Sequence, residues 1–162
     1  VCSSDLVIHK QKVDRPLDEV FEFFSNAENL ERLTPSFVNF EILSPLPIQM
    51  RVGARIAYKL KLWGVTLRWL TLIEAWDPPQ SFVDTQIRGP YQRWHHLHQF
   101  ESTADGGTLM TDKVELQVPL GPLGVIAYYA FVRRSLDEIF RYRAAVLERL
   151  ARYPHFQEPV NG

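Results

Sequence analysis

Three histidines lie within four positions in the segment RWHHLHQFE, residues 93–101. A neutral imidazole can bind a transition metal or accept a proton near neutral pH, and an imidazolium donates two hydrogen bonds. The segment is therefore a candidate metal site, catalytic base or polar pocket lining. The direction in which each ring points decides between these functions.

Strand parity separates the three histidines. Side chains along a β-strand alternate between two faces, so Trp94, His96, His98 and Phe100 share one face and His95 lies on the other. Trp94 and Phe100 are bulky and apolar, which favours a buried position for their face. We therefore expect His96 and His98 to point inward and His95 to point to solvent, and we expect no metal site that uses all three.

A carboxylate is expected beside the inward histidines. On the following strand Val114 should face inward, and Asp112 shares its parity. The residues at 105–107, Asp-Gly-Gly, predict the hairpin turn between the two strands. One register of this hairpin places Asp112 opposite His98. The adjacent register places it opposite Phe100, and in both cases Asp112 lies within reach of the imidazoles.

Two further charged side chains are candidates for the same interior. Asp84 shares a strand face with the bulky Phe82, which indicates a second inward carboxylate. Arg143 falls within the apolar stripe of a long helix, between Phe140 and Leu147. A cation at such a position either extends to the rim or pairs with a carboxylate, which a ligand can also supply.

Three interpretations of His96, His98 and Asp112 stay open. We favour an internal polar network that orients strands or a ligand, because buried polar groups need partners. In the second interpretation His96 or His98 is a general base that Asp112 orients. A metal site has suitable ligand types, but no third strong ligand stands out and the neighbours are aromatic. We therefore expect neither a metal nor a cofactor.

The rest of the chain predicts a strand, two short helices, a run of strands and a long amphipathic helix. Apolar periodicity places strands at 6–14, 37–43, 55–63, 66–76, 81–89, 91–102 and 108–118, and helices at 17–27, 26–33 and 124–152. A sheet with one apolar face must bury that face, and the long helix is the only large partner. If the sheet curls around this helix and the short helices close one end, incomplete filling leaves a cavity.

Four segments carry a resemblance to a known superfamily: VFEFFSNAENLERLTP at 20–35, WDPPQSFVDTQIRGPYQRWHHLHQFE at 76–101, GGTLMTDKVELQVPLGPLG at 106–124 and IFRYR at 139–143. Over about residues 7–152 the chain resembles the helix-grip (SRPBCC) superfamily, which includes START lipid-transfer domains, the birch-pollen allergen, polyketide cyclases and aromatases. It looks most like an uncharacterised bacterial ligand-binding subfamily related to polyketide cyclases and dehydrases. The resemblance implies an α+β helix-grip fold, with a curved antiparallel sheet around a long C-terminal helix and two short helices after the first strand. It implies a hydrophobic pocket more firmly than a reaction.

We therefore predict one ligand-binding domain over residues 7–153 that binds a small hydrophobic or amphipathic molecule as a carrier or sensor. One alternative is a cyclase, aromatase or dehydratase with histidine acid-base catalysis, for which His96, His98 and Asp112 are the catalytic candidates. Another is a protein-interaction or regulatory domain with a filled interior. The predicted ligand-binding residues combine the inward polar group with neighbouring apolar and aromatic side chains: Tyr58, Leu60, Trp69, Asp84, Trp94, His96, His98, Phe100, Asp112, Val114, Tyr129, Phe140 and Arg143.

The composition limits partners and location. A hydrophobic content of 46 % over 162 residues suffices for the core of one domain. A net charge of −1 gives no general attraction to nucleic acid, and we expect no such partner. The single cysteine, Cys2, and the lack of an apolar run of about 18 residues favour a cytoplasmic protein without stable membrane insertion. We expect a monomer or a weak homodimer.

Three segments differ in character from the rest of the chain. Residues 1–6, VCSSDL, are what the end of a widely used sequencing adapter encodes, so we expect them to be non-native. Residues 154–162 contain proline and are expected to form a flexible tail. An apolar loop rich in glycine and proline leads into an apolar helix start at 119–131. This pattern is typical of a gate for an apolar ligand or a weak membrane-docking lip, and simple packing on the helix end is the alternative.

Overall fold

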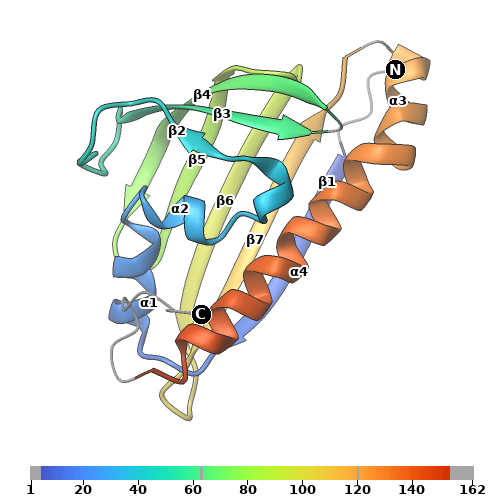
Figure 1. Ribbon diagram of the computed structural model, residues 1–162. Helices are drawn as coiled ribbons and strands as arrows, with labels where there is room; N and C mark the ends of the chain where they lie inside the picture. The colour runs from blue at the N-terminus through green and yellow to red at the C-terminus, as the bar shows by residue number, and fades with distance from the viewer. Residues whose placement is uncertain (1–4, 63, 120, 154–162) are drawn as a thin grey trace.

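The computed structural model describes residues 5–62, 64–119 and 121–153. Its main element is one antiparallel sheet in the order β1-β7-β6-β5-β4-β3-β2 (Figure 1). The strands are β1 (Asp5–Val13), β2 (Glu41–Ile42), β3 (Arg55–Leu62), β4 (Val65–Asp77), β5 (Ser81–Arg88), β6 (Arg93–Ser102) and β7 (Thr108–Gln117). Residues 1–4 of the expected non-native segment and the expected tail at 154–162 lie outside the described residues, whereas Asp5 and Leu6 belong to β1.

The helices lie on one side of the sheet. They are α1 (Leu17–Phe24), α2 (Asn29–Arg32), the 3₁₀ turn η1 (Ser36–Val38), α3 (Gly121–Ala127), the π-helical turn η2 (Tyr128–Val132) and α4 (Arg133–Leu150). Figure 1 shows α1 near the C-terminal end of α4 and α3 at the opposite end of the molecule. The predicted α+β helix-grip architecture is confirmed.

Two of the predicted elements differ in the structure. The predicted strand at 37–43 is wrong in its first part, because Ser36–Val38 forms a 3₁₀ turn and only Glu41–Ile42 pairs with β3. Asn39 ends this turn with φ 45°, a left-handed conformation that asparagine tolerates better than most residues. The predicted helix at 124–152 is interrupted by the π-turn η2, which shifts the phase of side chains on its two sides.

The hairpin between β6 and β7 has the first of the two predicted registers. His98 lies opposite Asp112 and His96 lies opposite Val114, so the shifted register is wrong. Gly106 adopts φ +83° in the connecting turn, a conformation that glycine reaches without steric cost. The tight turn therefore fixes which residues of the two strands face each other.

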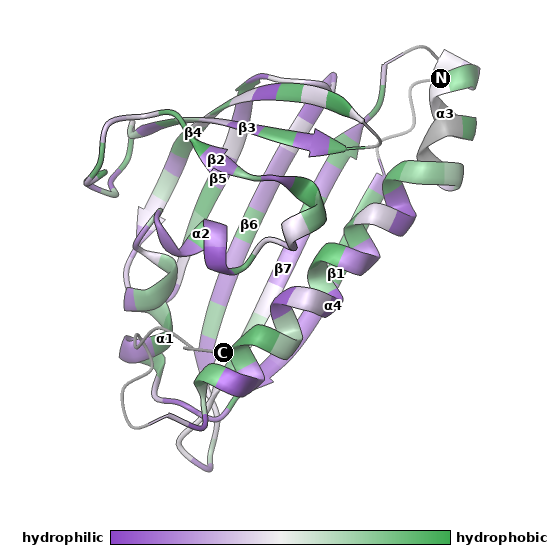
Figure 2. Cartoon of the chain, viewed as in Figure 1, coloured by the Kyte–Doolittle hydropathy of each residue, from purple (hydrophilic) through white to green (hydrophobic). Residues whose placement is uncertain are grey.

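A packed core fills the end of the molecule around α1. The helix buries Val20, Phe21, Phe23 and Phe24, which follow its apolar periodicity. Figure 2 shows how hydrophobic and hydrophilic residues alternate along the strands and around α4. We call this region the packed end, and its buried residues are Val13, Val20, Phe21, Phe23, Phe24, Leu33, Phe82, Phe100, Met110, Val146, Leu147 and Leu150.

Candidate functional site

Beyond the packed end, the inner side of the sheet borders a cavity of about 730 Å³. Strands β3 to β6, the α2–η1 segment and the η2–α4 helix supply its wall. Pockets for small molecules usually measure about 300–1,000 Å³ and are mostly apolar. The volume of this cavity lies within that range, and its wall is mostly apolar. Apolar lining residues include Phe24, Leu30, Val38, Ile56, Leu67, Ile73, Leu136 and Ile139.

Most of the residues predicted to contact a ligand lie on this wall. The period-two alternation of β3 places Tyr58 and Leu60 there, and the neighbouring strands add aromatic and polar groups. The predicted residues on the wall are Tyr58, Leu60, Trp69, Asp84, Trp94, His96, His98, Phe140 and Arg143.

Other predicted lining residues lie elsewhere. Parity places Phe100 on the inner face, but its ring packs against Phe21 and Phe24 in the packed end. Parity sets the face of a strand residue and not its height along the sheet, and Val114 is likewise part of the solid core. The side chain of Tyr129 is 58 % exposed and lies off the wall, because the π-turn breaks the continuity of the helical stripe.

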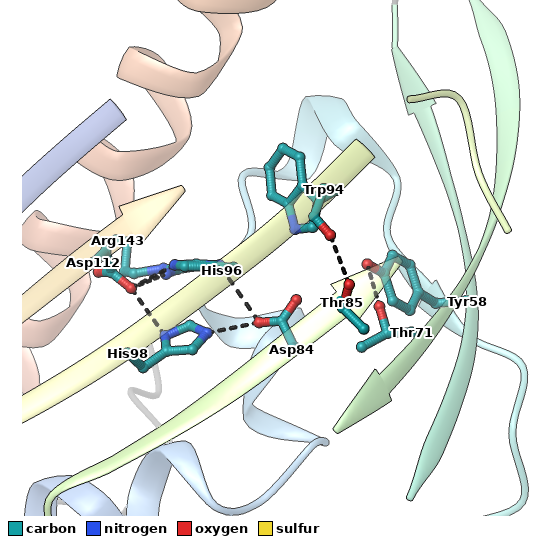
Figure 3. Close-up of polar contacts among 9 residues, drawn as sticks. All are labelled: Tyr58, Thr71, Asp84, Thr85, Trp94, His96, His98, Asp112 and Arg143. Atoms are coloured by element: carbon teal, nitrogen blue, oxygen red, sulfur yellow. Dashed lines mark hydrogen bonds and ion pairs between the residues drawn. The ribbon is translucent and has the colours of Figure 1, made fainter. Parts of the chain in front are cut away.

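A cluster of charged side chains interrupts the apolar wall. It contains Asp84 from β5, His96 and His98 from β6, Asp112 from β7 and Arg143 from α4 (Figure 3). Strand pairing brings it together, because Asp84 pairs with His96 and His98 pairs with Asp112. Only 3 % of the Asp112 side chain is exposed, so Asp112 lies behind the histidines and does not line the cavity.

The two imidazole rings connect the two carboxylates. Asp112 Oδ1 accepts a hydrogen bond of 2.8 Å from His96 Nε2, and Asp84 Oδ2 accepts one of 2.7 Å from His98 Nε2. His98 Nδ1 is 2.9 Å from Asp112 Oδ1, although the direction of this contact is not that of a good hydrogen bond. His96 Nδ1 lies 3.5 Å from Asp84 Oδ2, and the ring centroids are 3.7 Å apart.

The environment drives the pKa values of the two histidines in opposite directions. Burial and the neighbouring His98 charge lower the pKa of His96, against the effect of the carboxylates. Burial also acts to lower the pKa of His98, but hydrogen bonds and charges from Asp112 and Asp84 outweigh it and raise this pKa. The pKa of Asp112 falls well below its ordinary value because its hydrogen bonds to the histidines outweigh its burial.

These pKa shifts favour opposite charges within the cluster. The lowered pKa values of Asp84 and Asp112 favour their ionised forms, the raised pKa of His98 favours its cationic form, and the lowered pKa of His96 favours its neutral form. Arg143 Nη1 is 3.8 Å from Asp112 Oδ1, which completes the pairing. A buried group of this kind is stable only when each charge has a partner.

Among the described residues, three side chains of the wall have buried nitrogen atoms with no hydrogen-bond partner. These atoms are Trp69 Nε1, His98 Nδ1 and, on Arg143, Nε and Nη1. The Arg143 guanidinium also lies 5.3 Å from the centre of the Phe140 ring, a cation–π distance. Donors at an otherwise apolar wall can orient a ligand that carries an acceptor.

His9 and Tyr91 are neighbours of the site that the sequence interpretation missed. His9 pairs with Asp112 across β1 and β7 and stacks on Phe140, with ring centroids 5.1 Å apart. The parity of Val7 and Val13 on β1 could have revealed its inward direction. Tyr91 precedes β6 and stacks on Trp94 within the cavity wall, and a turn residue has no periodicity that predicts this position.

Asp84, His96 and His98 also offer one possible metal-donor atom each, all within 4.8 Å of one another. The expectation of no metal rests on the lack of a third strong ligand and on the aromatic neighbours, and it does not group Asp84 with the two histidines. The structure brings Asp84 beside them as a possible third donor, and the absence of a metal stays a prediction.

Comparisons with known proteins identify the family. Residues 13–139 match the family model described as polyketide cyclase / dehydrase and lipid transport. The chain belongs to this family. A search of curated proteins finds no match. The predicted membership of the SRPBCC superfamily is confirmed.

Solved structures of low sequence identity share the fold. The Zhui aromatase/cyclase from a Streptomyces species has a TM-score of 0.72 at 14 % identity, covering 92 % of this chain and 94 % of that one. A START superfamily protein from Mycobacterium smegmatis has a TM-score of 0.66 at 13 % identity, and the match covers 91 % of this chain and 96 % of that one. A major latex-like protein from Panax ginseng has a TM-score of 0.66 at 12 % identity, and the match covers 93 % of this chain and 99 % of that one. Among the described residues, no helix is long and apolar enough to cross a membrane.

Proposed function

We propose that the protein binds a small hydrophobic or amphipathic molecule in its cavity, as a carrier or a sensor. The observation that carries this proposal is a largely apolar cavity of about 730 Å³ with one polar cluster on its wall. Membership of a family that covers cyclases, dehydrases and lipid transport supports it. The alternative of an interaction domain requires a filled interior, and the cavity counts against it.

The distribution of polar groups favours an amphipathic ligand with one acceptor end. The apolar wall would bury most of such a molecule, and desolvation of its surface would supply most of the binding free energy. The donors of Arg143 and Trp69 would then receive a carboxylate, phenolate or carbonyl oxygen. A purely aliphatic molecule would leave these donors without a partner, which costs free energy.

Native mass spectrometry of protein purified from its own host, followed by lipid extraction, tests this proposal. We expect a co-purifying molecule of low mass, and its rebinding should change the fluorescence of Trp69 and Trp94. Leu67→Trp fills part of the cavity and should reduce binding at least tenfold. Leu43→Trp is the matched control at an exposed position off the wall and should bind as wild type. Equal binding by both variants would contradict the proposed location.

A second candidate function is a cyclase, aromatase or dehydratase for a polyketide-like substrate. The observation in its favour is that His96 and His98 lie side by side on the cavity wall, where the pKa of His96 is lowered and that of His98 is raised. Such a pair is suited to accept one proton and donate another. The structural similarity to an aromatase/cyclase adds support through the fold alone.

Turnover separates the two functions. If the protein is an enzyme, His98→Ala should abolish product formation, whereas a carrier with this substitution should only bind its ligand more weakly. The absence of product from aromatic polyketide substrates that bind tightly would contradict the enzyme. The cytoplasmic location, the bacterial origin, the monomeric or weakly dimeric state and the lack of a nucleic-acid partner stay predictions.

A further inference from the structure

We propose that Asp84, His96 and His98 form a binding site for a divalent transition-metal ion on the wall of the cavity. Two imidazole nitrogens and one carboxylate are a ligand set that such ions accept, with coordination positions left open. This inference goes beyond the proposed function, because an apolar ligand can occupy the cavity with or without a metal.

The distances between the donor atoms suit a shared ion. A tetrahedral or octahedral site with metal–ligand bonds of about 2.1 Å separates adjacent donors by roughly 3.0–3.4 Å. His96 Nδ1 is 3.5 Å from Asp84 Oδ2, and His98 Nε2 is 2.7 Å from the same oxygen. Of these two pairs only the second must widen, by roughly half an ångström, when an ion replaces the proton between its atoms. All three donor atoms lie within 4.8 Å of one another.

Asp112 supplies the support that metal-binding histidines need. Its Oδ1 lies 2.8 Å from His96 Nε2 and 2.9 Å from His98 Nδ1, which are the ring nitrogens on the far side from Asp84. Figure 3 shows Asp112 and Asp84 on opposite sides of the two rings. The hydrogen bond to Asp112 holds a proton on the outer nitrogen of His96, so that its inner nitrogen Nδ1 is free to ligate. The same carboxylate lies against the outer nitrogen of His98, and its charge favours a proton there.

The charges of the cluster are compatible with a divalent ion, and they also favour one kind of additional metal ligand. With both histidines neutral, Asp84, Asp112 and Arg143 carry a net charge of −1, and a divalent ion leaves +1. Arg143 lies beside Asp112, on the side of the rings that the ion does not occupy (Figure 3). The remaining positive charge favours an anionic oxygen of a cavity ligand as a further metal ligand. Imidazole donors favour zinc, cobalt or iron over magnesium and calcium.

A cobalt titration of the chelator-treated full chain tests the site. We expect one equivalent of Co²⁺ to produce visible ligand-field absorption, and Zn²⁺ to displace it. His96→Ala and His98→Ala should each abolish this absorption. His95→Ala is the matched control, because His95 has the opposite strand parity and lies outside the donor group, and it should bind as wild type. Asp112→Asn should weaken binding by roughly 10–100-fold, since it acts through the histidines.

Circular dichroism of each variant separates loss of ligands from loss of fold, and Asp84→Asn keeps the side-chain volume if an alanine variant unfolds. Wild-type protein that shows no cobalt absorption would overturn the proposal. So would absorption that persists in folded His96→Ala and Asp84→Asn variants. Ligand uptake is measured on the same metal-free protein. Failure of the metal site alone therefore leaves the proposed carrier function in place, and failure of uptake alone leaves the metal site in place.

Discussion

Strand β6 runs from a packed end to a hollow one, and the two ends differ in what covers the sheet. At the packed end Phe100 is 1 % exposed beneath the aromatic side chains of α1. At the hollow end Trp94 and His96 border the cavity, whose wall also includes residues of the α2–η1 segment and of the η2–α4 helix. The same strand therefore contributes to stability at one end and to a binding surface at the other.

His98 marks the boundary between the two ends. Its ring stacks on Phe82 with centroids 4.1 Å apart, and Phe82 belongs both to the packed end and to the cavity wall. The polar cluster is therefore anchored on solid core while it faces the open volume. This arrangement suits a binding site, because a rigid support holds functional groups in a fixed geometry.

The largest expected effect comes from truncation at the packed end. Phe100→Ala should lower the free energy of unfolding by about 3–5 kcal/mol, because it removes a fully buried ring and leaves a void in close packing. Leu60→Ala on the cavity wall should cost about 1 kcal/mol, since that side chain already borders open volume and has fewer contacts to lose. Urea unfolding of both variants measures the difference. Equal losses would mean that the two ends are packed alike.

The sequence predicts the packed end and the orientation of the histidines better than it predicts the cavity wall. The periodicity of α1 and the parity of β6 depend on local geometry, so the inward directions of Val20, Phe21 and His98 follow from spacing alone. The Asp-Gly-Gly turn limited the hairpin to two registers. The inward position of Asp112 beside the imidazoles could therefore be found before the structure was known, although the pairing of Asp84 with His96 could not.

Features that depend on distant parts of the chain were missed. Whether Phe100 lines a cavity or belongs to the core depends on which part of the sheet α1 packs against. The spacing of residues along a strand does not predict this position. The position of Tyr129 depends on a π-turn, for which helical periodicity has no signal. His9 enters the site through pairing of β1 with β7, which joins segments far apart in sequence.

An intermediate effect is expected from the buried charges between the two ends. Asp112→Asn removes the charge that two imidazoles and Arg143 share, and should cost roughly 1.5–3 kcal/mol of unfolding free energy at pH 7. Asp84→Asn should lower the unfolding free energy by less, because 17 % of the Asp84 side chain is exposed and Asp84 lines the cavity, whereas Asp112 is buried behind the histidines. Thermal or urea unfolding compares the two variants. A larger loss for Asp84→Asn would contradict the view that the cavity side is the less constrained one.

The smallest expected effect concerns a charge pair on the outside of the packed end. The ammonium of Lys12, followed by the Thr103 hydroxyl, lowers the pKa of Asp105 to about 2. Lys12→Met should raise this pKa toward the ordinary value of about 3.9, and carboxyl NMR titration measures it. A pKa that stays at about 2 in the variant would contradict this assignment.

The sign of the pH dependence follows from the lowered pKa of Asp105. Any stabilisation by the Lys12 pair is present above the ordinary aspartate pKa and is lost as the pH falls through about 2. Since both side chains are largely exposed, Lys12→Met should leave the unfolding free energy at pH 7 unchanged within error. A carboxylate with a lowered pKa thus occurs in both places, at Asp105 and at Asp112. Loss of the ion pair should leave stability unchanged at Asp105, where water replaces the missing partner. Loss of the charge at Asp112 should destabilise the protein, because water cannot reach the groups that it leaves unpaired.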